Sequence, residues 1–85
     1  MTPYRVLLAM EVVVALRACR SSDQRAITRL IEGLADNQFG QGDYVERDDV
    51  GRPIQVLIVG RHAVCFWANH ADKEVKVLDL KPAGS

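Results

Sequence analysis

Residues 42–80 decide the fold, and they read GDYVERDDVGRPIQVLIVGRHAVCFWANHADKEVKVLDL. Turn signals at residues 48–51, 60–61 and 69–72 divide this stretch into four runs with the composition of β-strands. Connections this short require neighbouring strands to pair antiparallel. The second half of the chain is therefore expected to form a four-stranded antiparallel meander.

Length and composition indicate one small globular domain that spans residues 1–85. Apolar residues make up 48% of the chain and charged residues 26%, a balance typical of folded proteins rather than disordered ones. Eleven lysines and arginines balance eleven aspartates and glutamates. No overall electrostatic field therefore attracts nucleic acid or a membrane surface.

The apolar opening of the chain is interrupted by Arg5 and Glu11. It falls well short of the roughly 20 apolar residues of a membrane span, and it lacks the pattern of a secretory leader. Cys19 and Cys65 are not spaced as metal-binding pairs, so both are expected to be unpaired packing residues. We therefore expect a cytoplasmic protein with no metal and no cofactor.

The first half of the chain predicts one strand and two helices. Residues 4–8 follow a proline and favour a strand. Residues 10–19 are assigned to a helix because their apolar side chains can share one face and a sheet needs a second layer. Residues 21–37 form the clearest helix, with a capping-box spacing at its start. Its apolar residues recur on one face: Ala26, Ile27, Leu30, Ile31 and Leu34.

These elements predict an α+β fold of two layers, in the order β-α-α-β-β-β-β, with a helical hairpin over one face of an antiparallel sheet. Both faces of the sheet are apolar at the centre. Trp67, on the face of Ala63 and Cys65, is expected to lie between the sheet and the helices.

Two short helices are enough to cover one face of this sheet, so the second apolar face is predicted to bind protein. Its occupant is either a partner chain or a second copy in a homodimer. The residues predicted to form this partner-binding face are Val64, Phe66, Leu78 and Leu80.

Motifs for catalysis are weak. The chain contains no GxSxG, HExxH, glycine-rich phosphate loop or paired-cysteine metal motif. His62 and His70 would stand about 26 Å apart on one strand, too far to share a metal ion. Glu46, Arg61 and His70 have the chemistry of a base, a phosphate clamp and an acid for a phosphodiester, although no spacing brings them together.

The order of elements, with the phrases at residues 4–6, 25–31, 42–44 and 73–80, resembles the RelE/ParE superfamily of toxins from type II toxin–antitoxin systems. Residues 60–67, GRHAVCFW, followed by the turn at Asn69 and His70, resemble the family's central strand and hairpin. The resemblance covers nearly the whole chain and implies a compact toxin-like fold with an antitoxin whose segment wraps it.

The resemblance also implies one of two targets. RelE-like toxins cleave messenger RNA on the ribosome, whereas ParE-like toxins inhibit DNA gyrase. This chain departs from the RelE-like nucleases at the matching places: Ala63 stands where a central-strand arginine is expected, and residues 55–57 contain no lysine. Residues 81–85 contain no counterpart of the family's terminal catalytic residues.

Two functional hypotheses follow. The first is a toxin-like component that acts by binding protein, with an antitoxin as partner and a gyrase-type target, and that lacks the usual residues for cleaving messenger RNA. The alternative is a ribosome-dependent endoribonuclease with a rearranged active site, for which the candidate residues are Glu46, Arg61, His70 and Lys76.

Overall fold

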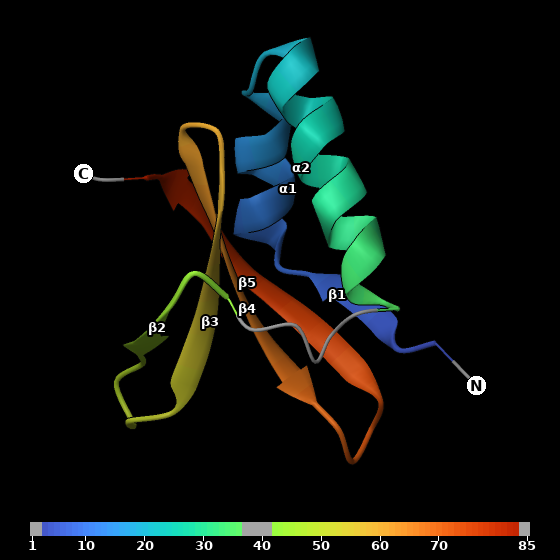
Figure 1. The fold of residues 1–85 in the computed structure, drawn as a ribbon, viewed down its shortest axis with the longest axis vertical. Coiled ribbons are helices and arrows are strands. Elements are labelled where there is room, and N and C mark those ends of the chain that lie inside the picture. The colour runs from blue at the N-terminus through green and yellow to red at the C-terminus, as the bar shows by residue number, and fades with distance from the viewer. Residues whose placement is uncertain (1–2, 37–41, 84–85) are drawn as a thin grey trace.

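The computed structural model describes residues 3–36 and 42–83 and confirms the α+β fold class (Figure 1). The predicted end of the second helix, at residue 37, lies outside the described residues. The elements are β1 (Arg5–Leu8), α1 (Met10–Arg17), α2 (Ser21–Leu34), β2 (Tyr44–Arg47), β3 (Pro53–Val59), β4 (His62–Asn69) and β5 (Glu74–Pro82).

The sheet has the strand order β1-β5-β4-β3-β2. The predicted meander is confirmed, because each strand from β2 to β5 pairs antiparallel with the strand that follows it in the chain. The expectation of an antiparallel sheet does not hold for β1, which pairs parallel with β5, so the sheet is mixed. The helical hairpin forms the connection between β1 and the rest of the sheet. The prediction was wrong because no local signal in the sequence shows which strand β1 will pair with.

Both helices lie on the same side of the sheet (Figure 1), and their buried side chains pack against those of β4 and β5. Phe66 is fully buried in the centre of the core between these layers. The other buried members come from both layers: Val12, Ile27, Ile31, Leu34, Val64, Val75, Val77 and Leu80. Burying this apolar surface is the main contribution to the stability of so small a domain.

The structure corrects the predicted partner-binding face. Val64 and Phe66 are fully buried under the helices, and Leu80 lies in the same core with 7% of its surface exposed. Of the four predicted residues, only Leu78 is on the surface, 37% exposed. Alternation along a strand separates two faces but does not tell which one the helices cover.

A β-bulge in β5 explains where Leu80 points. Cys65 pairs with Asp79 while its neighbour Phe66 pairs with Val77, so Leu78 is an extra residue on β5. An extra residue shifts the alternation by one position. Leu80 therefore lies on the same face as Val77, rather than on the opposite face as predicted.

Trp67 is also corrected, because it lies on the helix-free face of the sheet and is only half-buried. It packs against a second, smaller cluster formed by buried side chains of β3 and β4. These are Ile54, Val56, Ala63 and Cys65, with Ala83 packed beside them. Side chains of this chain therefore cover part of the helix-free face.

The two cysteines are unpaired, as predicted: Cys65 is buried and Cys19 is half-buried near the start of α2. Neither of the two described helices combines the length and the apolar character needed to cross a membrane.

We expect Phe66→Ala to lower the free energy of unfolding by about 3–5 kcal/mol, because it empties the centre of the core. Trp67→Ala should lower it by less, because the indole is half exposed and faces away from the helices. Urea unfolding followed by circular dichroism measures both changes. An equal or larger loss for Trp67→Ala would contradict the assignment of the two faces.

Candidate functional site

The helix-free face is built around Trp67, which two cations approach. The Arg52 guanidinium carbon lies 5.1 Å from the centroid of the Trp67 ring, and the Lys76 ammonium lies 5.6 Å from it. Lys76 is the cross-strand neighbour of Trp67 on β5. Cation–π contacts of this kind draw both positive charges onto the ring.

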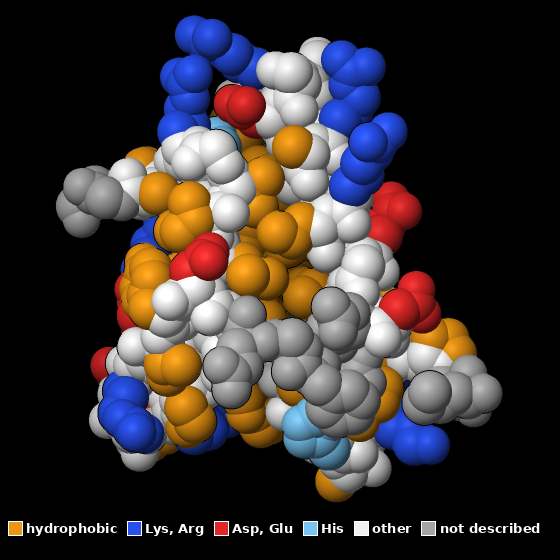
Figure 2. Space-filling view, viewed as in Figure 1, with side chains coloured by type: hydrophobic (Ala, Val, Ile, Leu, Met, Phe, Trp, Pro, Cys, Tyr) orange, Lys and Arg blue, Asp and Glu red, His pale blue; other side chains and the backbone are white. Residues whose placement is uncertain are grey.

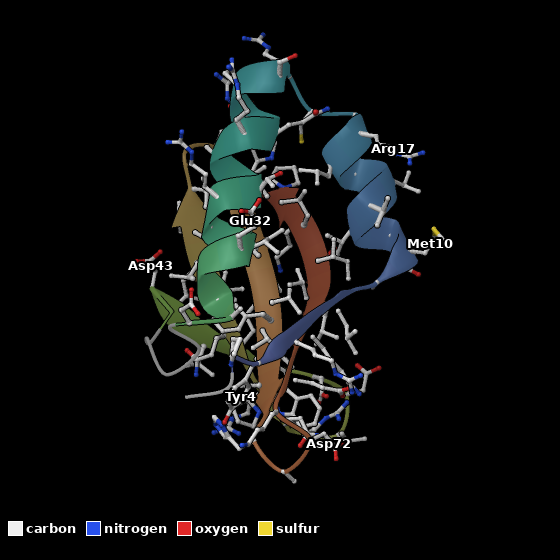
Figure 3. The ribbon with its side chains drawn as sticks, turned by 90° about the vertical axis from the view of Figure 1, so that its right-hand side faces the viewer. Tyr4, Met10, Arg17, Glu32, Asp43 and Asp72 are labelled. Carbon is white, nitrogen blue, oxygen red and sulfur yellow. The ribbon has the colours of Figure 1, made fainter. Side chains whose placement is uncertain are left out.

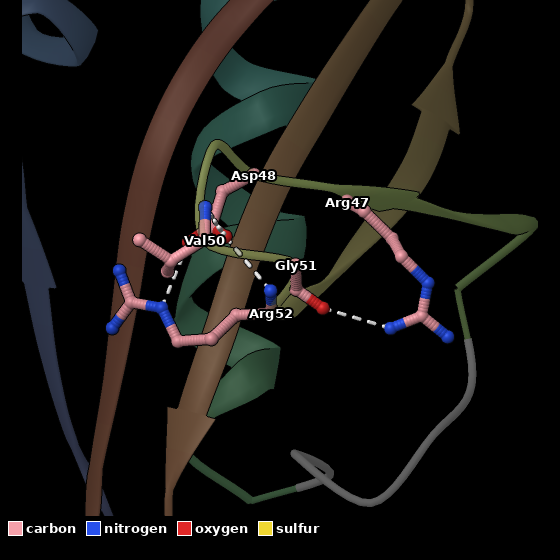
Figure 4. A network of polar contacts seen from close by, with 5 residues as sticks. All are labelled: Arg47, Asp48, Val50, Gly51 and Arg52. Carbon is pink, nitrogen blue, oxygen red and sulfur yellow. Dashed lines mark hydrogen bonds and ion pairs between the residues drawn. The ribbon is translucent and has the colours of Figure 1, made fainter.

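Arg52 is held in place by the turn between β2 and β3 (Figure 4). The Asp48 carboxylate accepts hydrogen bonds from the backbone N–H groups of Val50 and Arg52, at 3.1 and 2.8 Å. It also accepts one from Arg52 Nε at 2.8 Å, and this bond lowers the pKa of Asp48. Gly51 has a φ of 86°, a backbone conformation that residues with a side chain rarely adopt. Its carbonyl accepts a hydrogen bond from the Arg47 guanidinium.

Glu46 and Lys81 form a bidentate ion pair on the same side of the sheet. Lys81 Nζ donates to both Glu46 oxygens, at 2.9 and 3.0 Å. This hydrogen bonding raises the pKa of Lys81 above its ordinary value. The predicted base Glu46 is therefore already paired with a positive charge. Its partner Lys81 is 35 residues away in the sequence, and the sequence analysis did not predict this pair.

Two of the other candidates, Arg61 and His70, lie far from each other. Arg61 is in the turn before β4, whereas His70 is in the turn after it. Nine residues of extended chain place the two about 30 Å apart. His70 Nδ1 lies 2.9 Å from the Tyr4 hydroxyl, and their rings meet edge to face. The structure therefore does not bring Glu46, Arg61, His70 and Lys76 together into one site.

A polar cluster that the sequence did not predict lies where the two helices meet β4. His62 Nε2 is 3.3 Å from Asp23 Oδ2 and 4.0 Å from Cys19 Sγ. The cluster opens into a cavity of about 380 Å³, which Arg20 and Arg61 also line. No signal in the sequence joins residues this far apart.

The chemistry of the His62 cluster is limited by its geometry. The carboxylate of Asp23 and the thiol of Cys19 face the same ring nitrogen, whereas a nucleophilic triad uses the two nitrogens for different partners. Within residues 3–36 and 42–83, no group of three histidine, cysteine or acidic side chains is arranged to hold a metal ion.

A band of hydrophobic side chains is visible between α2 and β3 (Figure 2). We call Leu30, Leu57 and Val59 the α2–β3 band, together with Val45 of β2. Val45 pairs with Gln55 and therefore lies on the same face of the sheet as Leu57. Val45 is 51% exposed, and the other three are half-buried at the margin of the core. The band exists because the buried side chains of the two helices pack mainly against β4 and β5, so that Val45 of β2 and Leu57 and Val59 of β3 stay partly exposed.

Basic side chains gather at the end of the molecule where the two helices join (Figure 2). The arginines there are exposed: Arg17, Arg20, Arg25, Arg29 and Arg61. A chain with no net charge therefore has a local positive surface, and the exposed Arg25 and Arg29 of α2 belong to it.

Comparison with known proteins matches no family model and no curated protein sequence. It does find the same fold in solved toxin–antitoxin structures. The archaeal RelE–RelB complex from Pyrococcus horikoshii OT3 contains a chain with a TM-score of 0.81 and 25% identity, and the match covers 99% of this chain and 98% of that chain.

Two other solved structures are more distant in sequence. The RelBE2 toxin–antitoxin complex from Mycobacterium tuberculosis gives a TM-score of 0.78 at 15% identity, covering 94% of this chain and 98% of that chain. A mutant of the E. coli toxin RelE in the free state gives 0.72 at 7% identity, covering 96% and 85%.

We expect Cys65 to resist alkylation in the folded protein, because it is 3% exposed and burial raises the pKa of its thiol. In a Cys19→Ser variant, labelling by iodoacetamide should begin at a higher pH in the folded chain than in urea. Mass spectrometry of timed samples measures the rate. Equal pH profiles in the two states would contradict this environment for Cys65.

Proposed function

We propose that this chain, which has the fold of the RelE toxins, is the toxin-like component of a type II toxin–antitoxin pair and acts by binding protein. The likeness in fold extends over nearly the whole chain. Two of the matched structures are complexes of a toxin with its antitoxin, which supports an antitoxin as the partner.

The engagement of the cations on the helix-free face favours binding over cleavage of messenger RNA. Cleavage of a phosphodiester needs a base and anion-stabilising groups within hydrogen-bond reach of one phosphate. Here Lys81 is paired with Glu46, Arg52 is paired with Asp48, and Lys76 lies against Trp67. These contacts engage the three cations of the helix-free face, so none of them is free to act on a phosphate there.

The α2–β3 band is the surface that we assign to the antitoxin. An amphipathic segment buries its apolar side chains in such a band through regularly spaced anchors. Arg25 and Arg29 on the neighbouring helix provide guanidinium groups that suit carboxylates at the edge of the segment. This band takes the place of the predicted face of Val64 and Phe66, which the helices cover.

Action by protein binding also fits a protein target of the gyrase type better than it fits the ribosome as the target. Docking on an RNA-rich surface is driven by neutralising phosphates, and the chain has no net positive charge. The alternative of a rearranged endoribonuclease would need Arg61 and His70 to act together from opposite ends of β4. A toxin–antitoxin pair of this kind would work in the cytoplasm.

Purified protein added to a translating extract should leave messenger RNA intact, because Arg61 and His70 lie at opposite ends of β4 and cannot act together on one phosphate. Primer extension on the transcript detects any cut. Specific cleavage that disappears in Arg61→Ala or Lys76→Ala would overturn the proposal and favour the ribonuclease.

Val45→Asp should weaken binding of the product of the adjacent reading frame at least tenfold, because it places an unpaired carboxylate in the α2–β3 band. Val50→Asp is the matched control: Val50 is 79% exposed in the turn after β2, outside the band. Circular dichroism checks that both variants fold, and calorimetry measures the affinity. Equal affinities would show that the band is not the antitoxin seat, whereas no binding by the wild-type chain would count against the pair itself.

A further inference from the structure

β1 leaves one edge of its backbone without a partner. The N–H of Arg5 donates to the Lys73 carbonyl at 2.9 Å, and the N–H of Ala9 donates to the Val77 carbonyl at 3.0 Å. Because backbone groups alternate in direction along a strand, the N–H and C=O of Val6 and Leu8 point away from β5. Within the part of the chain that the structure describes, these groups have no hydrogen-bond partner.

The surroundings of this edge are apolar. Leu7 is 42% exposed, Leu8 39% and Met10 73%. On the helix side, a groove of about 400 Å³ runs along the strand. Val6, Leu8 and Leu16 are among its apolar lining residues, and Thr28 and Glu32 of α2 line it as well. Figure 3 shows β1 crossing this side of the molecule from Tyr4 toward Met10, beneath the two helices.

β1 is a short edge strand of four residues, but most of the other devices that stop an edge strand from pairing are missing from it. It contains no proline, no lysine and no bulge, and its single charge, Arg5, is paired with Glu74. The opposite edge strand, β2, instead carries Glu46 and Arg47 among its four residues. Of the two edges, β1 is therefore the one suited to adding a strand.

We propose that a second copy of this chain pairs antiparallel along β1, with the two-fold axis at Leu7. In this register Val6 lies opposite Leu8 of the second copy, and Leu8 lies opposite Val6. These are the two residues whose backbone groups point outward, so each pair exchanges both of its hydrogen bonds. The contact is isologous and closes as a dimer.

The side chains agree with the same register. Val6 and Leu8 both line the groove, so the grooves of the two copies join across the axis. Leu7 meets Leu7 of the second copy on the helix-free side, and Arg5 falls opposite Ala9, so no like charges meet. A slip by one residue would turn these side chains to opposite faces. The match of apolar side chains and the absence of a like-charge contact along β1 in this register favour a second copy over an unrelated strand.

Leu8→Pro tests the backbone pairing. Proline removes an outward N–H that has no bond within the described chain, and edge strands accept it. Leu8→Ala is the matched control because it keeps the N–H. We expect sedimentation equilibrium to show dimers for wild type and Leu8→Ala, and at least a tenfold larger dimer dissociation constant for Leu8→Pro with an unchanged circular dichroism spectrum.

Disulfide crosslinking tests the register in a Cys19→Ser background. Leu7→Cys should form a crosslinked dimer on mild oxidation, because the two residues face each other at the axis. Arg5→Cys should not, because two copies of that position lie roughly 13 Å apart, beyond the 7 Å limit for a disulfide.

Three results would overturn the proposal. They are a wild-type chain that stays monomeric at all concentrations, equal crosslinking at both positions, and a dimer that Leu8→Pro does not weaken. A monomeric chain whose complex with the adjacent gene product is weakened by Leu8→Pro would assign the β1 edge to an antitoxin strand instead.

Discussion

The single extra residue at Leu78 determines which side chains of β5 enter the core. Val77 lies under the helices opposite Phe66, and strict alternation from there would turn Asp79 into the core and Leu80 out of it. Burying the unpaired carboxylate of Asp79 would cost several kcal/mol. The bulge instead keeps Asp79 on the helix-free side and returns Leu80 to the core. It also places Lys81 on the side where it meets Glu46.

The surfaces available for binding follow from how this core is covered. Two short helices over β4 and β5 bury Phe66 and its neighbours, while a second small cluster fills the middle of the helix-free face. The α2–β3 band and the β1 edge are left outside this coverage, and both are apolar with little charge of their own. Within the described residues, the exposed apolar surface therefore gathers in the α2–β3 band and along the β1 edge.

The elements of the fold could be predicted because each has a local cause. Gly51 and Gly60 adopt positive φ values in the turns that the sequence marks, and the apolar period of α2 matches its buried residues Ile27, Ile31 and Leu34. Which face of the sheet the helices cover could not be predicted, because both faces are apolar at the centre and an alternating pattern does not distinguish them. The pairing of β1, the ion pair of Glu46 and the cluster at His62 depend on residues far apart in sequence, for which one sequence gives no signal.

Hydrogen–deuterium exchange of this chain, alone and with the product of the adjacent reading frame, is the most direct test of function through protein binding. The core amides of β4 should exchange slowly in both states. The account predicts that binding slows exchange in β2, in β3 and along α2, where the α2–β3 band lies. Unchanged exchange in these elements, or slowing confined to the helix-free face around Trp67, would contradict it.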